Sequence, residues 1–230
     1  MAEAARANKQ RICYIFGAGE PPVKPPAVKP EDLVIAADGG YLYTERAGIR
    51  ADALIGDFDS VDISKAPPDT GEDGPLVIRL PKEKDVTDMM ASLDYGLKRG
   101  FACFHIYGGA GGRADHFIAN VQCLAFLANN GARGFLHAGD SALTAFRGAV
   151  TLIPGLLASA GGIVSVFALG GPAEGVFLRG LKYELNNARL SADFPLGVSN
   201  ELTKEPAYIG AESGMLLAAY PEGTELIPVY

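Results

Sequence analysis

The first 138 residues alternate apolar runs with segments of helical periodicity. The apolar runs are short and rich in β-branched or aromatic residues, and they predict buried strands at 12–16, 33–37, 53–55, 76–80, 104–107 and 134–138. Apolar residues at helical spacing predict helices at 41–47, after Asp85 and at 114–130, with Gly48, Gly100 and Gly131 as their ends. This alternation is typical of a doubly wound, mainly parallel α/β sheet.

From Ser141 onward the apolar runs are shorter and are separated by glycine or proline, and no segment has a convincing helical pattern. The runs lie at 143–146, 150–153, 163–169, 176–178, 183–185, 207–209 and 215–220. Regularly spaced short strands predict an all-β sandwich or barrel, of which we expect the sandwich. We therefore expect an α/β domain at 1–139 and a β-sandwich domain at 140–230.

Composition narrows the class of protein. The chain has 230 residues, of which 48% are hydrophobic, and a formal net charge of −7, which gives no overall attraction for nucleic acid or an anionic membrane. Its three cysteines, Cys13, Cys103 and Cys123, lie in apolar surroundings without metal-binding spacing. No apolar stretch approaches the length of a membrane span. We expect a cytoplasmic protein without nucleic-acid or membrane partners.

Aspartates lie at or just beyond the ends of three predicted strands. Asp38 follows the second strand, Asp57 and Asp59 follow the third, and Asp88 lies in the first turn of the helix after the fourth. Open α/β sheets bind ligands at the carboxyl ends of their strands, and carboxylates suit Mg²⁺. Asp57, Asp59 and Asp88 are the candidate Mg²⁺ ligands. The structural alternatives are turn residues and, for Asp88 and the N-cap candidate Asp85, helix capping.

A glycine-rich loop follows the fifth predicted strand and precedes a helix. Gly108, Gly109, Gly111 and Gly112 cost conformational entropy, but they permit a close approach of the backbone to a ligand. Loops of this kind bind phosphate through backbone N–H groups, and Arg113 adds a planar fork for phosphate oxygens. The loop lacks the lysine of a Walker A motif, and a structural turn is the alternative.

Acidic residues and a phosphate loop at one rim of a sheet imply a cation between them. The combination indicates Mg²⁺-dependent phosphoryl or pyrophosphoryl transfer from a nucleotide. An Asp-x-Asp pair after a strand also serves phosphohydrolases and nucleotidyl or sugar transferases. A nucleotide-sensing module without turnover is a further alternative.

Five motifs in order resemble the thiamine pyrophosphokinase family. They are ADGG at 37–40, GDFDS at 56–60, KDVTD at 84–88, GGAGGRADH at 108–116 and SN at 199–200. The resemblance implies transfer of the terminal diphosphate of ATP to the hydroxyl of thiamine, which gives thiamine diphosphate and AMP. It also implies a homodimer with thiamine bound near the subunit interface.

The resemblance assigns roles to individual residues. Asp57, Asp59 and Asp88 would hold Mg²⁺, and Lys84, Asp88, Ser199 and Asn200 would contact or border thiamine. The residues around ATP would be Asp38, Gly39, Gly108, Gly109, Gly111, Gly112, Arg113, Asp115 and His116. Arg113, Asp59 and Asp88 are the expected catalytic residues, with Asp88 either orienting or deprotonating the hydroxyl, or acting only as a metal ligand. Animal members place a tryptophan against thiamine, whereas this chain has no tryptophan and offers Met215, Leu216 and Leu217 in that region.

Overall fold

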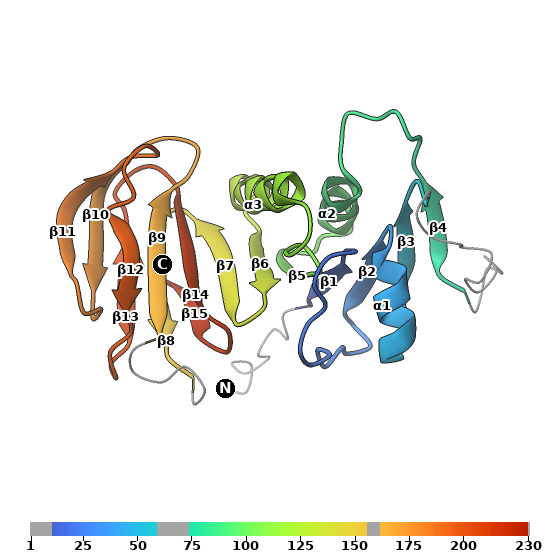
Figure 1. Ribbon diagram of the computed structural model, residues 1–230, viewed down its shortest axis with the longest axis horizontal. Coiled ribbons are helices and arrows are strands. Elements are labelled where there is room, and N and C mark those ends of the chain that lie inside the picture. The colour runs from blue at the N-terminus through green and yellow to red at the C-terminus, as the bar shows by residue number, and fades with distance from the viewer. Residues whose placement is uncertain (1–10, 59–73, 156–161, 230) are drawn as a thin grey trace, which may run out of the picture.

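The computed structural model describes residues 11–58, 74–155 and 162–229, which form two β-sheets and three helices (Figure 1). The first part of the chain contains β1 (Cys13–Phe16), β2 (Leu33–Ala37), α1 (Gly40–Ala47), β3 (Ala53–Gly56), β4 (Leu76–Arg79), α2 (Asp88–Lys98), β5 (Cys103–Tyr107), α3 (Ala114–Asn129) and β6 (Arg133–Ala138). None of the helices in the described segments has the length and hydrophobicity needed to cross a bilayer.

The six strands of this part are parallel and lie in the order β6-β5-β1-β2-β3-β4. Alternate side chains of β1 serve two cores: Cys13 and Ile15 pack on the face covered by α2 and α3, and Tyr14 and Phe16 pack on the face covered by α1. Helices therefore cover both faces of the sheet. The predicted doubly wound, mainly parallel fold is confirmed.

The second part of the chain contains strands only among its described residues. They are β7 (Ser141–Phe146), β8 (Ala149–Ile153), β9 (Ile163–Ala168), β10 (Ala173–Arg179), β11 (Leu185–Leu190), β12 (Gly197–Glu201), β13 (Ala207–Gly210), β14 (Leu216–Pro221) and β15 (Glu225–Val229). Four of them, β7, β14, β9 and β12, extend the first sheet by antiparallel pairing, and the other five form a second sheet in the order β11-β10-β13-β8-β15.

The two sheets of the second part enclose a common apolar core. Tyr220 of β14 and Val166 of β9 meet Leu152 of β8 and Leu178 of β10 there, and each of these residues is buried. This arrangement confirms the predicted all-β sandwich. The first sheet continues without interruption from β6 into β7, and the division into domains at residue 139 stays a prediction.

The N-cap of α2 differs from the prediction, and β11 contains an irregularity. Helix α2 is capped by Thr87, whose side chain accepts a hydrogen bond from the backbone N–H of Met90 at 3.1 Å, and not by Asp85. Asn187 has a φ of 48° and lies inside β11, where the pairing with β10 shifts register, so it forms a bulge within the strand. A polar sequence with a left-handed residue can still pair as an edge strand.

Candidate functional site

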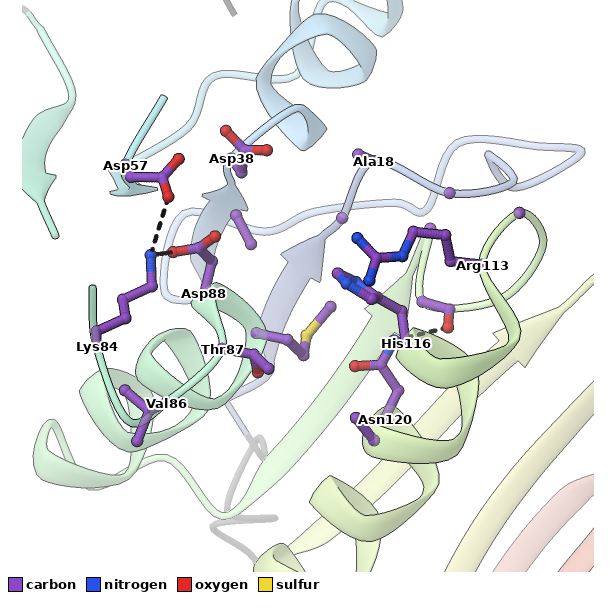
Figure 2. Close-up of a pocket in the computed structure, with 18 of the residues that line it drawn as sticks. Ala18, Asp38, Asp57, Lys84, Val86, Thr87, Asp88, Arg113, His116 and Asn120 are labelled. Atoms are coloured by element: carbon purple, nitrogen blue, oxygen red, sulfur yellow. Dashed lines mark hydrogen bonds and ion pairs between the residues drawn. The ribbon is translucent and has the colours of Figure 1, made fainter. Parts of the chain in front are cut away.

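The candidate site lies where the connections of the parallel strands change direction. β1 pairs with β2 on one side and with β5 on the other, and such a switch point opens a crevice at the carboxyl ends of the strands. A cavity of about 560 Å³ occupies this position. Figure 2 shows Asp38, Asp57 and Asp88 on one side of it and Arg113 and His116 on the other.

The loops after β1 and β5 line the cavity, and their backbones are hydrogen-bonded to each other. The N–H groups of Gly17, Gly19 and Glu20 donate to the carbonyl oxygens of Tyr107, Gly108 and Ala110 at 2.8, 2.9 and 2.8 Å. A Cβ atom on Gly19 would lie 2.3 Å from the Ala110 oxygen, so the close approach requires glycine. The sequence analysis singled out the glycines after β5 and gave Gly17 and Gly19 no ligand-binding role.

Lys84 lies between two of the predicted metal ligands. Its Nζ is 2.8 Å from Oδ1 of Asp88 and 3.4 Å from Oδ2 of Asp57, and all three side chains are less than a quarter exposed. Burial lowers the pKa of Lys84, but the hydrogen bond and charge of Asp88, then those of Asp57, outweigh it and raise the pKa above its ordinary value. Lys84 therefore stays protonated between the two carboxylates.

The remaining predicted site residues on this side of the cavity are Asp38, Gly39 and Asp59. Asp38 lines the same cavity in a left-handed backbone conformation with a φ of 45°. A Cβ atom on Gly56 would lie 3.1 Å from the Asp38 Cα, which explains a glycine at the end of β3. Gly39 lines an adjoining cavity beside α1 instead. Asp59 lies outside the described residues.

The donor set of the acidic side fits Mg²⁺ as it is bound together with substrate phosphates. The described residues contain no group of three or more acidic, histidine or cysteine side chains that could hold an ion unaided. Asp57 and Asp88 nevertheless turn toward one common cation, the ammonium of Lys84. One or two carboxylates, completed by water and phosphate oxygens, suffice for Mg²⁺ in nucleotide sites.

Arg113 lines the opposite side of the cavity and is largely exposed. Its Nε and Nη2 donate to the carboxylate of Asp115 at 3.1 and 2.6 Å, which lowers the pKa of Asp115 to about 2. The backbone N–H of His116 also donates to Asp115, at 3.0 Å. Arg113 and His116 line the cavity, whereas Asp115 does not line it and instead binds these two residues.

Asn120 is a residue of the site that the sequence reasoning missed. It lies in α3, is buried, and donates from Nδ2 to the carbonyl oxygen of Gly109 at 2.7 Å. This hydrogen bond fixes the glycine loop to the helix that follows it. A polar side chain on the buried face of a helix, directly after a glycine loop, was the available signal.

Ser199 and Asn200 lie in β12, at the far edge of the ten-stranded sheet (Figure 1). Asn200 is buried, accepts from the N–H groups of Tyr183 and Glu201 at 2.9 Å each, and donates to the Tyr183 carbonyl at 2.6 Å. Ser199 is exposed and has a φ of 58°. Neither residue lines the cavity of its own chain. Met215, Leu216 and Leu217 are buried in the two cores.

The fold and the cavity define a protein of two parts, in which a doubly wound sheet with a ligand site at its switch point is extended into a β-sandwich. Two family models match the chain: thiamin pyrophosphokinase, catalytic domain, at residues 26–136, and thiamin pyrophosphokinase, vitamin B1 binding domain, at residues 156–216. The chain belongs to the thiamin pyrophosphokinase family.

Individual relatives agree with this placement. Thiamine pyrophosphokinase of Bacillus subtilis is 37% identical over 98 residues, which span 40% of this chain and 42% of that protein. The crystal structure of the Bacillus subtilis enzyme has a TM-score of 0.78 at 26% identity, over 92% of this chain and 99% of that chain. The thiamin pyrophosphokinase of Geobacillus thermodenitrificans has a TM-score of 0.76 at 26% identity, over 92% and 97%.

Proposed function

We propose that this protein transfers the terminal diphosphate of ATP to the hydroxyl of thiamine and releases AMP. The observation that carries the proposal is the shared cavity, in which carboxylates face a glycine loop and an arginine across one switch point. Membership in the thiamin pyrophosphokinase family supplies the substrates. Acids that face a phosphate loop favour a metal-bound polyphosphate over an uncharged ligand, because the metal ion joins the two sets of negative charge.

Each side of the cavity has its own task in this reaction. Backbone N–H groups of the loop at 108–112 and the guanidinium of Arg113 bind the phosphates and stabilise the charge that develops on them. The thiamine hydroxyl attacks the β-phosphorus in line, the bond from that phosphorus to the α–β bridging oxygen breaks, and AMP leaves with the bond electrons.

Asp57 and Asp88, together with Asp59, would hold Mg²⁺, which when bound neutralises the migrating diphosphate. Asp88 has a second role in this proposal, because it lines the same cavity as the phosphate-binding loop. In that role its carboxylate orients the thiamine hydroxyl and takes its proton as the new bond forms.

We further propose that thiamine is bound between two copies of the chain. Five inter-strand spacings separate β12, which carries Ser199, from β5, whose end forms the cavity. At about 4.8 Å per strand this is about 24 Å, too far for one small molecule to touch both. A twofold partner that brings its β12 edge to the cavity removes this difficulty.

One incubation tests the reaction against its alternatives. The purified protein is mixed with ATP, MgCl₂ and thiamine, and the products are separated by chromatography. We expect equal amounts of AMP and thiamine diphosphate. ADP or inorganic phosphate formed without thiamine would indicate a hydrolase, and tight ATP binding without any product would indicate a sensor.

Subunit complementation tests the shared thiamine site. Arg113→Ala and Ser199→Trp are each expected to inactivate the protein alone. When the two variants are unfolded and refolded together, about half of the dimers contain one subunit of each variant. One of the two sites in such a dimer carries neither substitution, so activity should return to about a quarter of wild type. If the mixture stays inactive, Arg113 and Ser199 of different subunits do not form one site, and the shared thiamine site is refuted.

A further inference from the structure

Two lysine–aspartate pairs with the same i,i+4 spacing occur at α2, and only one of them is protected from water. Lys98 and Asp94 are 2.7 Å apart on the exposed surface of the helix, with side chains 73% and 46% exposed. Lys84 and Asp88 are 2.8 Å apart at the cavity, with side chains 13% and 23% exposed. An exposed pair of this kind contributes little to stability, whereas a shielded one is a strong electrostatic contact.

The Lys84 ammonium also reaches the second acid, Asp57, 27 positions away in the chain, at 3.4 Å. It therefore bridges two carboxylates that approach from β3 and from the start of α2 (Figure 2). A divalent ion that bridges the same two carboxylates needs oxygen atoms at about 2.1 Å, and an ammonium on those oxygens would lie almost in contact with the ion. Two cations at that separation repel strongly in a shielded cavity.

The geometry points to an exchange of cations: we propose that Lys84 occupies the position of the metal ion until a polyphosphate arrives, and then moves onto its phosphate oxygens. This inference rests on the proposed use of ATP with Mg²⁺. Lys84 lies outside helix and strand, between β4 and α2, and carries a flexible four-carbon stem, so its ammonium can move a few ångströms without breaking an element. The phosphate loop and Arg113 line the same cavity.

The consequence is that metal and nucleotide bind as a unit. Without nucleotide, an incoming ion must displace the ammonium from Asp57 and Asp88, and the ammonium loses its two nearest anions. With nucleotide, the ammonium exchanges one set of anionic oxygens for another, and the carboxylates are released for the ion. Such an arrangement favours the complete pair of substrates over a free divalent ion.

Replacement of the lysine tests this directly, with Mn²⁺ as the probe because Mn²⁺ shares the oxygen preference of Mg²⁺ and its free form is measured by electron paramagnetic resonance. In the absence of nucleotide, Lys84→Met should bind Mn²⁺ at least about tenfold more tightly than the wild type. In EDTA, the same variant should bind α,β-methylene-ATP more weakly. Opposite shifts of the two affinities are the signature of exchange.

Two controls separate exchange from a general effect of charge. Lys98→Met removes the same charge from the exposed pair and should leave both affinities unchanged. Lys84→Arg keeps the cation and should keep the weak binding of Mn²⁺. Far-ultraviolet circular dichroism establishes that each variant is folded, and Lys84→Gln replaces Lys84→Met if the latter is not.

An unchanged or weakened affinity of a folded Lys84→Met or Lys84→Gln protein for Mn²⁺ would overturn the proposal. The titration contains no thiamine and requires no turnover. Failure to form thiamine diphosphate in the incubation above would therefore refute the proposed reaction alone, and an unchanged Mn²⁺ affinity would refute the exchange alone.

Discussion

The imidazole rings of His105 and His137 are joined by a hydrogen bond of 2.9 Å between Nδ1 of the first and Nε2 of the second. They lie on the neighbouring strands β5 and β6, and Nδ1 of His137 is 2.9 Å from Oε2 of Glu222, just beyond β14. The chain of three residues connects the parallel strands to the sandwich. Both histidines are half-buried, and His137 has a partner at each ring nitrogen.

The half-buried position of His105 in this hydrogen-bonded group should make the free energy of unfolding depend on pH. Burial, and then the nearby His137, lower the pKa of His105 from 6.5 to about 4. The unfolded chain takes up this proton as the pH falls below 6.5, whereas the folded protein does so only near pH 4, so the free energy of unfolding decreases between these values, by up to about 3 kcal/mol. Urea unfolding at a series of pH values between 7.5 and 4.5 measures this change in the free energy of unfolding. A His105→Phe variant should have a flatter profile, and an equal slope in both proteins would refute the assignment.

Asp88→Asn should reduce turnover by about a hundredfold or more, because the amide cannot serve as an anionic metal ligand or accept a proton. The variant should remain folded, since Asp88 lies at a cavity and not in a core. Asp94→Asn, one and a half turns further along α2 and exposed, is the matched control and should retain wild-type kcat. Steady-state rates of AMP formation make the comparison. Equal rates for the two variants would remove Asp88 from the reaction.

Arg113→Lys should lower kcat/KM for ATP by about tenfold to a hundredfold, because a point charge cannot replace a planar fork at phosphate oxygens. Asp115→Asn weakens the ion pair that holds Arg113 but leaves the guanidinium in place, and its effect should be smaller. The pair is exposed on both sides, so neither change should alter the unfolding midpoint much. A larger loss in Asp115→Asn than in Arg113→Lys would assign phosphate binding elsewhere.

Gly19→Ala should separate the two hydrogen-bonded loops that line the cavity. The new Cβ would meet the carbonyl oxygens of Ala110 and Gly108 at 2.3 and 2.7 Å, and backbone atoms cannot move aside as a flexible side chain can. We expect weaker binding of AMP by calorimetry and a lower unfolding midpoint. Gly131→Ala, in open space at a φ of 71°, carries only the cost of its conformation, about 1 kcal/mol, and should bind AMP normally. Normal binding in Gly19→Ala would mean that the loops do not contact the nucleotide.

The fold and the rim of the site were predictable because their signals are local. Each motif is contiguous in the sequence and directly follows a strand or begins a helix. Asp38, Asp57, Asp88 and the glycine loop could therefore be placed at one edge, because parallel strands of a doubly wound sheet end on the same side. The capping residue of α2 was misassigned because Asp85 and Thr87 are both good caps and only the backbone decides between them.

The remaining features depend on contacts between distant residues. The pairing of Gly19 with Gly108, the bridge made by Lys84 and the burial of Asn200 each join segments that no periodicity relates. The strands β11 and β12 were missed because their sequences are polar and each contains a residue with positive φ, Asn187 and Ser199. Such strands are recognised by their partners rather than by their own residues.

The antiparallel pairing of β6 with β7 limits which β-sandwich domains could be joined to this α/β domain. Leu143 and Ala145 of β7 and Leu217 of β14 belong to the same apolar core as the residues of α3. If the chain were cut after Ala138, the edge of β6 and part of that core would be exposed, and unpaired edges invite aggregation. The two parts are therefore not interchangeable modules. A foreign β-sandwich could replace the native one only if it presented an antiparallel strand of the same register and an apolar face that fits α3.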